Sequence, residues 1–303
     1  MSLLGCVLGG AVGDGLGAPI EFSSIDVIRR QYGPDGVVDL PTLEITDDTQ
    51  MVLFTLEGLL LAREHGVDPL LTVRAAYARW LHTQGGPPVA SDGWLMADQR
   101  LHSRRAPGHT CITALKHNEK NNSKGCGGVM RAAPVAVWSS DVREVFTLAV
   151  GTAQMTHHHP SGYLSAGVLA VIVRQLLGGA DLPSAVAVAR AELVRWDGHE
   201  EQTSLLDKVM GGLGPLTPEE IESELGGGWV GEEALAIGLH AALVGADFAD
   251  AVRIAVNHSG DSDSTGSICG NILGARDGVA AIPSSWLSVL ELRDVIERLA
   301  LSW

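Results

Sequence analysis

The chain has 303 residues, of which 46% are hydrophobic, and its 36 acidic and 21 basic side chains give a formal net charge of −15. This composition excludes a disordered chain and predicts a packed globule, large enough for one big core or two ordinary domains. The negative charge opposes binding to nucleic-acid phosphates and anionic lipids, so we expect no membrane partner and no bulk nucleic-acid binding.

The four cysteines are scattered, and no two have the spacing of a zinc ribbon or of a thioredoxin motif. Four cysteines in a chain of this length do not indicate a disulfide scaffold either. They favour a reducing compartment, so we expect a cytoplasmic protein. The four are Cys6, Cys111, Cys126 and Cys269.

Apolar residues recur at helical spacing through most of the chain. The first apolar run, residues 3–12, has no Lys or Arg before it, so we interpret it as a buried helix rather than a signal peptide. No other apolar run is expected to reach the roughly 18 residues of a membrane span. The further predicted helices cover residues 51–63, 142–155, 162–177, 182–196, 232–244, 248–256, 267–275 and 287–301.

Signals for strands are almost absent, and residues 36–40 are the one short candidate. Residues 91–124 are polar and irregular, which predicts a long functional loop with one short helix. No linker separates two halves and no internal repeat is visible, so residues 1–303 are predicted to form one all-α domain. No exposed apolar stripe stands out, which favours a monomer.

Two adjacent carboxylates, Asp47 and Asp48, follow Thr46 immediately before a predicted helix. Acidic side chains in a first helical turn are favoured by the helix dipole and by exposed N–H groups, and for two aspartates alone this is the simpler interpretation. The alternative is a site for a hard cation, because carboxylates and hydroxyls are the oxygen ligands that magnesium and manganese prefer.

A second acidic group strengthens the interpretation as a cation site over that as a simple helix start. Asp261 and Asp263 lie two residues apart among small residues, with the Ser264 hydroxyl beside them. Their spacing matches the opening of an EF-hand, but the Glu required at the twelfth position is Ile272 here, which excludes that motif. A loop with Asx-turns and a helix cap is the alternative for either group alone. Carboxylates from both groups in one place would repel one another unless cations lay between them.

Three further segments carry groups suited to a ligand. The glycines at 13–17 superficially suggest a dinucleotide loop, but no strand precedes them, and Glu21 is interpreted as an acid on the loop that follows. The turn at 123–131 is either a cradle of backbone N–H groups for phosphate oxygens or an ordinary flexible turn. Consecutive histidines at 157–159 cannot easily chelate one ion, so we expect one or two of them to contact ligand hydroxyls or to order a carboxylate.

Together these segments resemble the ADP-ribosylglycohydrolase family, which includes the dinitrogenase reductase activating glycohydrolase and the ADP-ribosylarginine and ADP-ribosylserine hydrolases. The similarity runs through nearly the whole chain in order, and TDDT together with GDSDSTG is its most specific part. The segments are GDGLGAPIEF, TDDTQM, SKGCGGVMRAAPVA, THHHP, GGGWVGEEAL and GDSDSTGSICGNILGA. The resemblance implies a compact orthogonal helical bundle, which agrees with the all-α prediction.

The resemblance also implies roles for individual residues. The predicted ligands of two Mg²⁺ ions, or of Mn²⁺, are Thr46, Asp47, Asp48, Asp261, Asp263 and Ser264, with Ser264 in place of the family's usual Thr. The predicted catalytic residues are Glu21, Asp48 and Asp261. The predicted substrate-binding residues are Ser123, Gly125, Cys126, Gly127, Gly128, Val129, Met130, His157, His159 and Trp229. Of these, Cys126 stands where the family commonly has Asn, and Trp229 stands where related enzymes place a Tyr.

The activity that the resemblance implies is metal-dependent hydrolysis of the N- or O-glycosidic bond between ADP-ribose and a modified acceptor, with ADP-ribose as a product. The acceptor would be a protein side chain or another group such as a nucleic-acid base. Two alternatives are kept. A non-catalytic ADP-ribose-binding or structural relative would show no turnover, and a different metal hydrolase, such as a phosphohydrolase, would release AMP or phosphate.

Overall fold

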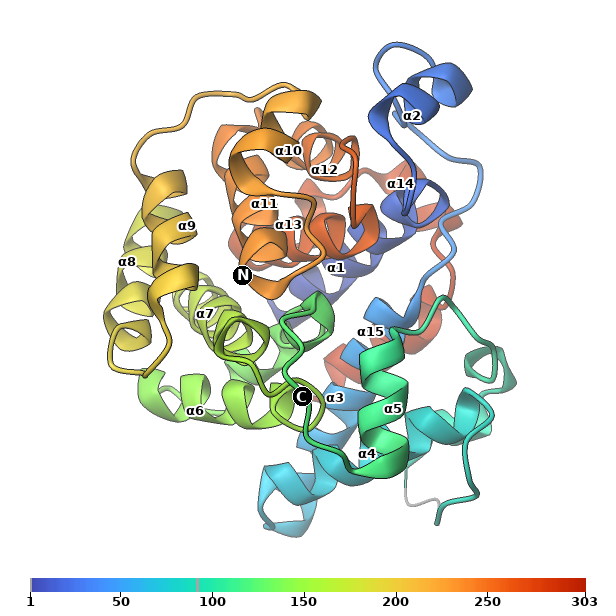
Figure 1. The fold of residues 1–303 in the computed structure, drawn as a ribbon. Helices are drawn as coiled ribbons and strands as arrows, with labels where there is room; N and C mark the ends of the chain where they lie inside the picture. The colour runs from blue at the N-terminus through green and yellow to red at the C-terminus, as the bar shows by residue number, and fades with distance from the viewer. Residues whose placement is uncertain (1, 91–92) are drawn as a thin grey trace.

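The computed structural model describes residues 2–90 and 93–303, and within them the chain forms helices and loops but no β-sheet (Figure 1). The all-α prediction is therefore confirmed. The helices are α1 (Leu3–Gly17), α2 (Ile25–Tyr32), α3 (Asp47–His65), α4 (Pro69–Thr83), α5 (His109–His117), α6 (Val142–Ala153), α7 (Pro160–Leu177), α8 (Leu182–Leu193), α9 (Glu200–Met210), α10 (Pro218–Leu225), α11 (Gly231–Val244), α12 (Phe248–Val256), α13 (Ser262–Asp277), α14 (Ser284–Val289) and α15 (Arg293–Leu301).

Helices α1 and α13 lie against each other, antiparallel, near the centre of the bundle, because glycines face one another along both (Figure 1). A Cβ atom added at Gly9 would lie 2.3 Å from the carbonyl oxygen of Gly270, and one added at Gly270 would lie 2.0 Å from that of Gly9. The facing pairs are Gly5 with Gly274, Gly9 with Gly270 and Gly13 with Gly266. Only residues without a side chain permit the two helix backbones to lie this close together. The close packing brings Asp14 of α1 and Asp263 of α13 into the same region.

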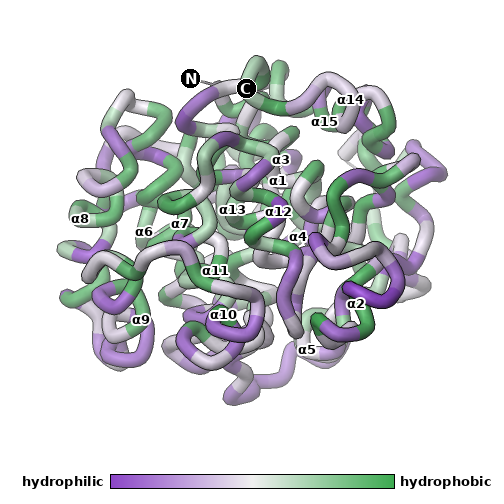
Figure 2. The backbone as a smooth tube through the Cα atoms, turned by 90° about the horizontal axis from the view of Figure 1, so that it is seen from above, coloured by the Kyte–Doolittle hydropathy of each residue, from purple (hydrophilic) through white to green (hydrophobic). Residues whose placement is uncertain are grey.

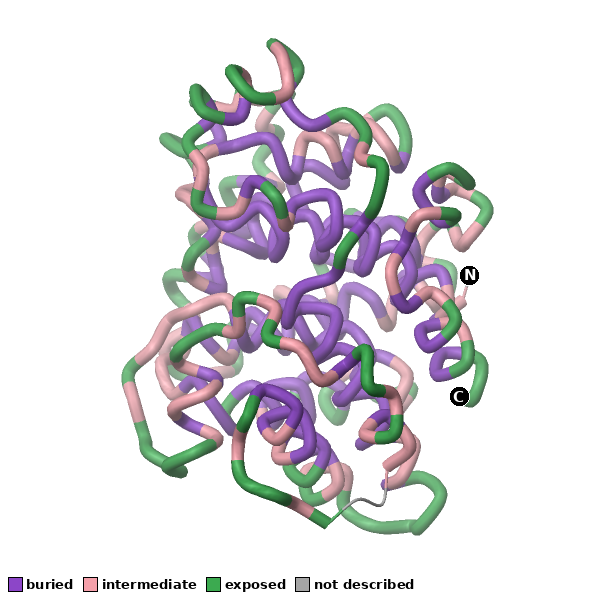
Figure 3. The backbone as a smooth tube through the Cα atoms, turned by 90° about the vertical axis from the view of Figure 1, so that its right-hand side faces the viewer, coloured by how far each residue is buried: buried purple, intermediate pink, exposed green. Residues whose placement is uncertain are grey.

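One large cluster of buried apolar side chains fills the bundle, and both α1 and α7 contribute to it. Figure 3 shows buried helices in the middle with exposed turns around them. In Figure 2 many hydrophilic residues lie on outer segments such as α2, α9 and α10. The prediction of a buried first helix is confirmed, since nearly every residue of α1 is buried.

Two helices are long and apolar enough to cross a membrane, judged by length and composition alone: Leu3–Ile20 and Pro160–Leu177. The prediction that no apolar run after the first reaches this length is therefore wrong for α7. Within the structure, 83% of the first window and 72% of the second are buried against other parts of the protein. Such burial is what core helices show.

The predicted strand at 36–40 is wrong. These residues form an irregular segment, and the Val37 backbone N–H donates to Oδ1 of Asn257 while the Asn257 side-chain amide donates back to the Val37 carbonyl. One amide side chain, at the C-cap of α12, thus satisfies the backbone groups that a partner strand would otherwise satisfy.

The predicted helix at 287–301 is two helices, α14 and α15. Between them the chain binds to Leu43, whose N–H donates to the Val289 carbonyl and whose carbonyl accepts from the Glu291 N–H. Leu292 then adopts a left-handed conformation with φ 56° before α15 begins. This tertiary pairing interrupts an apolar periodicity that is continuous in the sequence.

The predicted helix at 267–275 is too short at its start, because α13 begins at Ser262. Asp263 and Ser264 therefore lie in its first turn rather than in a loop. The Thr265 hydroxyl donates to the backbone carbonyls there, and Gly17 of α1 still lies directly against Ser262. Smaller differences occur at α6 and α8, which end two and three residues earlier than predicted.

Helices α2, α4, α9 and α10 have no counterpart among the predicted ones. The sequence of α4 carries arginines that interrupt its apolar face, yet Arg79 is buried. Its Nε and Nη2 donate to Oε2 of Glu57 on α3 at 3.1 and 2.9 Å, and both side chains are at most 2% exposed. The ion pair with Glu57 compensates the charge of the buried Arg79 side chain. The periodicity of apolar residues along α4 contains no information about this partner.

Replacing Arg79 with methionine is expected to lower the free energy of unfolding by about 3–5 kcal/mol, because the Glu57 carboxylate would stay buried without its cation. Denaturant unfolding followed by circular dichroism measures this loss. The matched control is the double variant Glu57→Gln/Arg79→Met, which retains an acceptor for the Leu95 N–H that Glu57 binds at 2.9 Å. An equal loss in the two variants would contradict the explanation by an unpaired buried charge.

Candidate metal and substrate site

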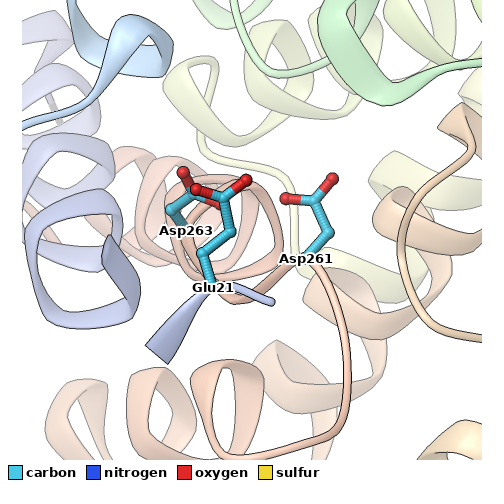
Figure 4. A group of neighbouring side chains, drawn as sticks. All are labelled: Glu21, Asp261 and Asp263. Carbon is cyan, nitrogen blue, oxygen red and sulfur yellow. The ribbon is translucent and has the colours of Figure 1, made fainter. Parts of the chain in front are cut away.

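Carboxylates from three separate segments converge on one cavity of about 160 Å³. Glu21 follows the short 3-10 turn η1 (Ala18–Ile20), Asp47 and Asp48 open α3, and Asp261 and Asp263 lie at the start of α13. Ligand oxygens of Glu21, Asp261 and Asp263 lie within 4.8 Å of one another, and Figure 4 shows the three carboxylates pointing to the same side. The structure thus brings the two predicted acidic groups together, while their role as metal ligands stays a prediction.

A sixth carboxylate, Asp14 on α1, lies fully buried beside this group. It accepts hydrogen bonds from the backbone N–H groups of Thr46 and Thr49 and from the Thr49 hydroxyl. Asp14 therefore holds the first turn of α3 against α1. Asp14 is not among the predicted site residues, although an aspartate inside an otherwise apolar and glycine-rich helix is a usable signal.

Burial and mutual repulsion raise the pKa values of these carboxyl groups. The pKa of Glu21 rises to about 10 and that of Asp14 to about 7, in both cases through desolvation first and the Asp263 charge second. The same two causes raise the pKa values of three more carboxyl groups well above their usual range, namely those of Asp47, Asp48 and Asp261.

The cavity has the chemistry of a divalent-cation site. Among the described residues that line it there is no Lys or Arg, so nothing on its walls neutralises the carboxylates. Oδ2 of Asp48 is buried without a hydrogen-bond partner in the described part of the chain. An oxygen-rich, uncompensated set of this kind fits Mg²⁺ or Mn²⁺.

The pKa of Asp14 predicts how stability depends on pH in protein stripped of metal. The carboxyl group ionises near pH 3.8 in the unfolded chain but only at about pH 7 in the folded one. Its protonated form thus stabilises the fold fully below about pH 3.8, and this contribution is lost as the pH rises through about 7. Relative to Asp14→Asn, wild-type protein in chelator should lose thermal stability between pH 5 and pH 8, as scanning calorimetry can measure. If the melting temperatures of wild type and Asp14→Asn changed with pH in the same way, the raised pKa of Asp14 would be contradicted.

Two other predicted ligands differ in their position. Ser264 lines the cavity, and its backbone N–H donates to Oδ1 of Asp263. Thr46 is not among the cavity-lining residues; it is the N-cap of α3, and its hydroxyl accepts from the Asp48 N–H at 3.2 Å. Thr46 thus caps the helix and fixes the backbone of Asp48 in the first turn of α3.

The glycine-rich turn at 123–130 contributes only part of its length to the cavity, through Gly125, Cys126, Gly127 and Met130. Several of its amides are already used within the protein: Gly125 N–H donates to the Ser123 hydroxyl, Cys126 N–H to the Trp229 carbonyl and Met130 N–H to the Cys126 carbonyl. The remaining predicted positions lie away from the cavity walls: Ser123, Gly128 and Val129. The turn is therefore an anchored part of the site rather than a flexible loop.

The three histidines have three different surroundings. His157 lines the cavity, and burial together with the Arg131 charge lowers its pKa to about 3, so the ring is neutral. Its Nδ1 lies 2.8 Å from the Thr156 hydroxyl, which leaves Nε2 for a ligand. His158 Nδ1 accepts from a backbone N–H, and His159 caps α7 by accepting from the Ser161 N–H. The predicted contact of His159 with substrate therefore has no support in its position.

Trp229 also lies outside the cavity walls, on the loop before α11. Its ring stacks on Phe22, with centroids 5.3 Å apart and planes 17° from parallel, and the two side chains are 43% and 70% exposed. Phe22 directly follows Glu21 and has a left-handed backbone with φ 67°. The loop that carries the site's glutamate is thus joined to the Trp229 loop by an exposed aromatic pair.

Several lining residues come from the polar segment 91–124 and were not predicted individually: Ala106, Gly108, His109, Thr110 and Cys111. The expected short helix in this segment is α5, while Ser91 and Asp92 lie outside the described residues. The segment is tied to the site because the Asp47 N–H donates to the Arg105 carbonyl and Gly108 N–H donates to Oδ2 of Asp47. Its polarity was a signal for function, but no single residue in it stood out.

Comparison with known proteins agrees with this geometry. The family model described as ADP-ribosylglycohydrolase matches residues 2–302. The chain is 28% identical to the ADP-ribosyl-[dinitrogen reductase] glycohydrolase of Rhodospirillum rubrum, over 96% of this chain and 90% of that protein. It is 25% identical to the ADP-ribosylarginine hydrolase Tri1 of Pseudomonas putida, over 98% of this chain and 76% of that protein.

A solved structure, an ADP-ribosylglycohydrolase-related protein complex, aligns with a TM-score of 0.72 at 28% identity. The alignment covers 99% of this chain and 95% of that one. The match of the family model to nearly every residue, together with a shared fold and an acidic cavity, shows that this chain belongs to the ADP-ribosylglycohydrolase family.

Proposed function

We propose that the protein is a metal-dependent hydrolase that cleaves the N- or O-glycosidic bond between ADP-ribose and a modified acceptor, releasing ADP-ribose. The observation that carries the proposal is the convergence of five carboxylates on one cavity whose described walls hold no Lys or Arg, in a chain of this family. A non-catalytic relative would have no need of so many mutually repelling buried acids.

Two Mg²⁺ ions, with Mn²⁺ as the alternative, would be held from two sides of the cavity. The proposed ligands are Thr46, Asp47 and Asp48 at the start of α3 and Asp261, Asp263 and Ser264 at the start of α13. Bound there, the ions supply Lewis acidity toward the ribose hydroxyls or a water molecule and neutralise the surrounding negative charge.

The chain's own groups would then position and stabilise the substrate. The neutral His157 ring presents Nε2 to a ligand hydroxyl, and the anchored turn at Gly127 and Met130 forms the adjoining wall. As the glycosidic bond breaks, positive charge develops on the ribose, and the Asp48 and Asp261 carboxylates stabilise it electrostatically.

Glu21 is the proposed group for proton transfer. Its carboxyl lines the cavity, and one of its oxygens lies within 4.8 Å of ligand oxygens of Asp261 and Asp263, which would bring it within reach of a leaving group. It lies on the partly exposed loop after η1, and its side chain lines the cavity.

The proposal also concerns which acceptor carries the ADP-ribose. The names of the two relatives specify a modified dinitrogen reductase and an ADP-ribosylated arginine. An acidic cavity also suits a cationic leaving group such as guanidinium, although bound metals require the same charges. We therefore place an ADP-ribosylated protein first among the partners, with nucleic-acid bases and O-acetyl-ADP-ribose as further acceptors.

The test is a substrate panel with and without Mg²⁺: ADP-ribosylated arginine, ADP-ribosylated serine, an ADP-ribosylated base and O-acetyl-ADP-ribose. At least one should release free ADP-ribose, and chelator should abolish that release. Binding of ADP-ribose with no release from any substrate would identify a non-catalytic relative. AMP or phosphate as the product would identify a phosphohydrolase.

A further inference from the structure

The thiol of Cys126 lies among the proposed metal ligands. Its Sγ donates to Oδ2 of Asp261 at 2.8 Å and accepts from the Ser264 hydroxyl at 3.6 Å. Asp48, from the other side of the cavity, also acts electrostatically on this sulfur. A sulfur atom is thus in contact with oxygen donors of one acidic group and within electrostatic reach of the other.

A second, independent observation indicates that a cation belongs in the cavity beside Cys126. Oδ2 of Asp48 is buried and accepts no hydrogen bond in the described part of the chain, although Asp48 lines the same cavity as Cys126. A buried carboxylate oxygen without a partner is costly, and a cation between it and the neighbouring donors would satisfy it.

The backbone around Cys126 is anchored on several sides. Cys126 N–H donates to the Trp229 carbonyl at 3.3 Å, and the Cys126 carbonyl accepts from Val129 and Met130. Gly127 and Gly128 complete the 3-10 turn, and Gly128 lies directly against Gly162 of α7. The Cys126 backbone is therefore held in place, and its sulfur is held in turn by its contacts with Asp261 and Ser264.

We propose that Cys126 is itself a ligand of the metal centre, so that one cation is held by a mixed set of oxygen atoms and sulfur. This inference rests on the proposed metal-dependent function and deepens it. When the cation binds, a metal–sulfur bond forms and the thiol proton leaves to solvent, with no change of oxidation state. Oδ2 of Asp261 then no longer accepts a hydrogen bond from the thiol and becomes free to bind the same cation.

A sulfur donor changes which cation the centre prefers. Carboxylates and hydroxyls suit Mg²⁺ and Mn²⁺, whereas thiolate favours later and softer divalent ions such as Co²⁺ and Zn²⁺. The expected consequence is a centre that binds Co²⁺ or Zn²⁺ more tightly than Mg²⁺ by a margin that depends on Cys126.

The chain contains its own matched control. Cys111 also lines the cavity, but its Sγ accepts from Nη1 of the buried Arg131 at 3.4 Å, so its sulfur is occupied by a cationic side chain. Cys6 and Cys269 are buried within α1 and α13 and are not among the cavity-lining residues. Cys126→Ser and Cys111→Ser therefore each remove one cavity sulfur, with opposite expected results.

The experiment loads metal-stripped wild-type and variant proteins with Co²⁺ and records two signals: visible d–d bands, which report binding, and near-ultraviolet sulfur-to-cobalt charge transfer, which reports a thiolate ligand. Wild type and Cys111→Ser should show both signals. Cys126→Ser should keep the d–d bands and lose the charge transfer. Calorimetric titration with Co²⁺ and Mg²⁺ should show the Co²⁺ preference reduced about 10–100-fold in Cys126→Ser, and circular dichroism checks that each variant is folded.

The outcomes separate this inference from the proposed function. Cobalt binding without charge transfer in wild type overturns the sulfur ligand while leaving the metal centre intact. Charge transfer that persists in Cys126→Ser overturns it as well, because the sulfur would come from another cysteine. Absence of any Co²⁺ or Mg²⁺ binding removes the metal centre, and the proposed function fails with it.

Discussion

Replacing Asp261 with asparagine is expected to lower ADP-ribose release at least about 100-fold while the protein stays folded. Asp261 is buried, lies within 4.8 Å of two other carboxylates and would bind a cation directly. The substitution also removes one of the charges that repel one another in the metal-free cavity. Thermal stability without metal should therefore be unchanged or higher, which separates a functional loss from a folding loss.

The measurements are turnover on the best substrate of the panel and calorimetric melting with and without Mg²⁺. Mg²⁺ should raise the melting temperature of wild type clearly and that of Asp261→Asn little, because ligand binding stabilises only a protein with an intact site. Glu222→Gln is the matched control, since it removes the same charge from an exposed position of α10 that is not among the described cavity walls. Turnover equal to that of wild type in Asp261→Asn would contradict the proposed role of Asp261 as a metal ligand needed for hydrolysis.

Replacing Gly9 with valine is expected to lower the free energy of unfolding by about 3 kcal/mol, through overpacking between α1 and α13. The first added carbon would lie 2.3 Å from the Gly270 carbonyl oxygen, which belongs to the backbone and cannot rotate away. Even Gly9→Ala should destabilise, although alanine is intrinsically the better helix former by about 1 kcal/mol. Denaturant unfolding gives both values.

The control for this prediction is Gly214→Ala, where an added Cβ would meet no atom within 4 Å. That variant should match wild type or exceed it slightly, through the smaller entropy of its unfolded chain. Gly9→Val should also lose activity beyond its loss of stability, because separating the helices moves the start of α3, which Asp14 holds against α1, relative to Asp263 on α13. Stability equal to wild type in Gly9→Ala would show that the helices are not held at this distance.

The helical class follows from the sequence because helical periodicity is a local property. The helices at 51–63 and 162–177 were visible for this reason, and both lie within observed helices. Where a distant residue changed the local pattern, the prediction was wrong. Leu43 splits α14 from α15, Asn257 takes the place of a strand partner at Val37, and Glu57 makes the burial of Arg79 feasible.

The acidic groups are likewise a property of the sequence, because each is a short run of neighbouring residues. Either run alone also suits a helix start, and the presence of both in one chain is what predicts a cation site. The facing glycines are present in the sequence at 5, 9 and 13 and at 266, 270 and 274, but nothing local shows that the two runs face each other. Their pairing positions the site, since it brings α1 and α13 into contact along their backbones.

By itself, then, the sequence determined the helical class and the two acidic motifs, together with the family that those motifs resemble. Only the tertiary structure decided which groups share the cavity: Asp14 against Thr46 and Thr49, the loop at 106–111 against Asp47, and the Cys126 sulfur against Asp261. The physical reason is that these contacts join residues far apart along the chain, and their free energy depends on how closely the backbones between them pack. No local pattern of side chains encodes that distance.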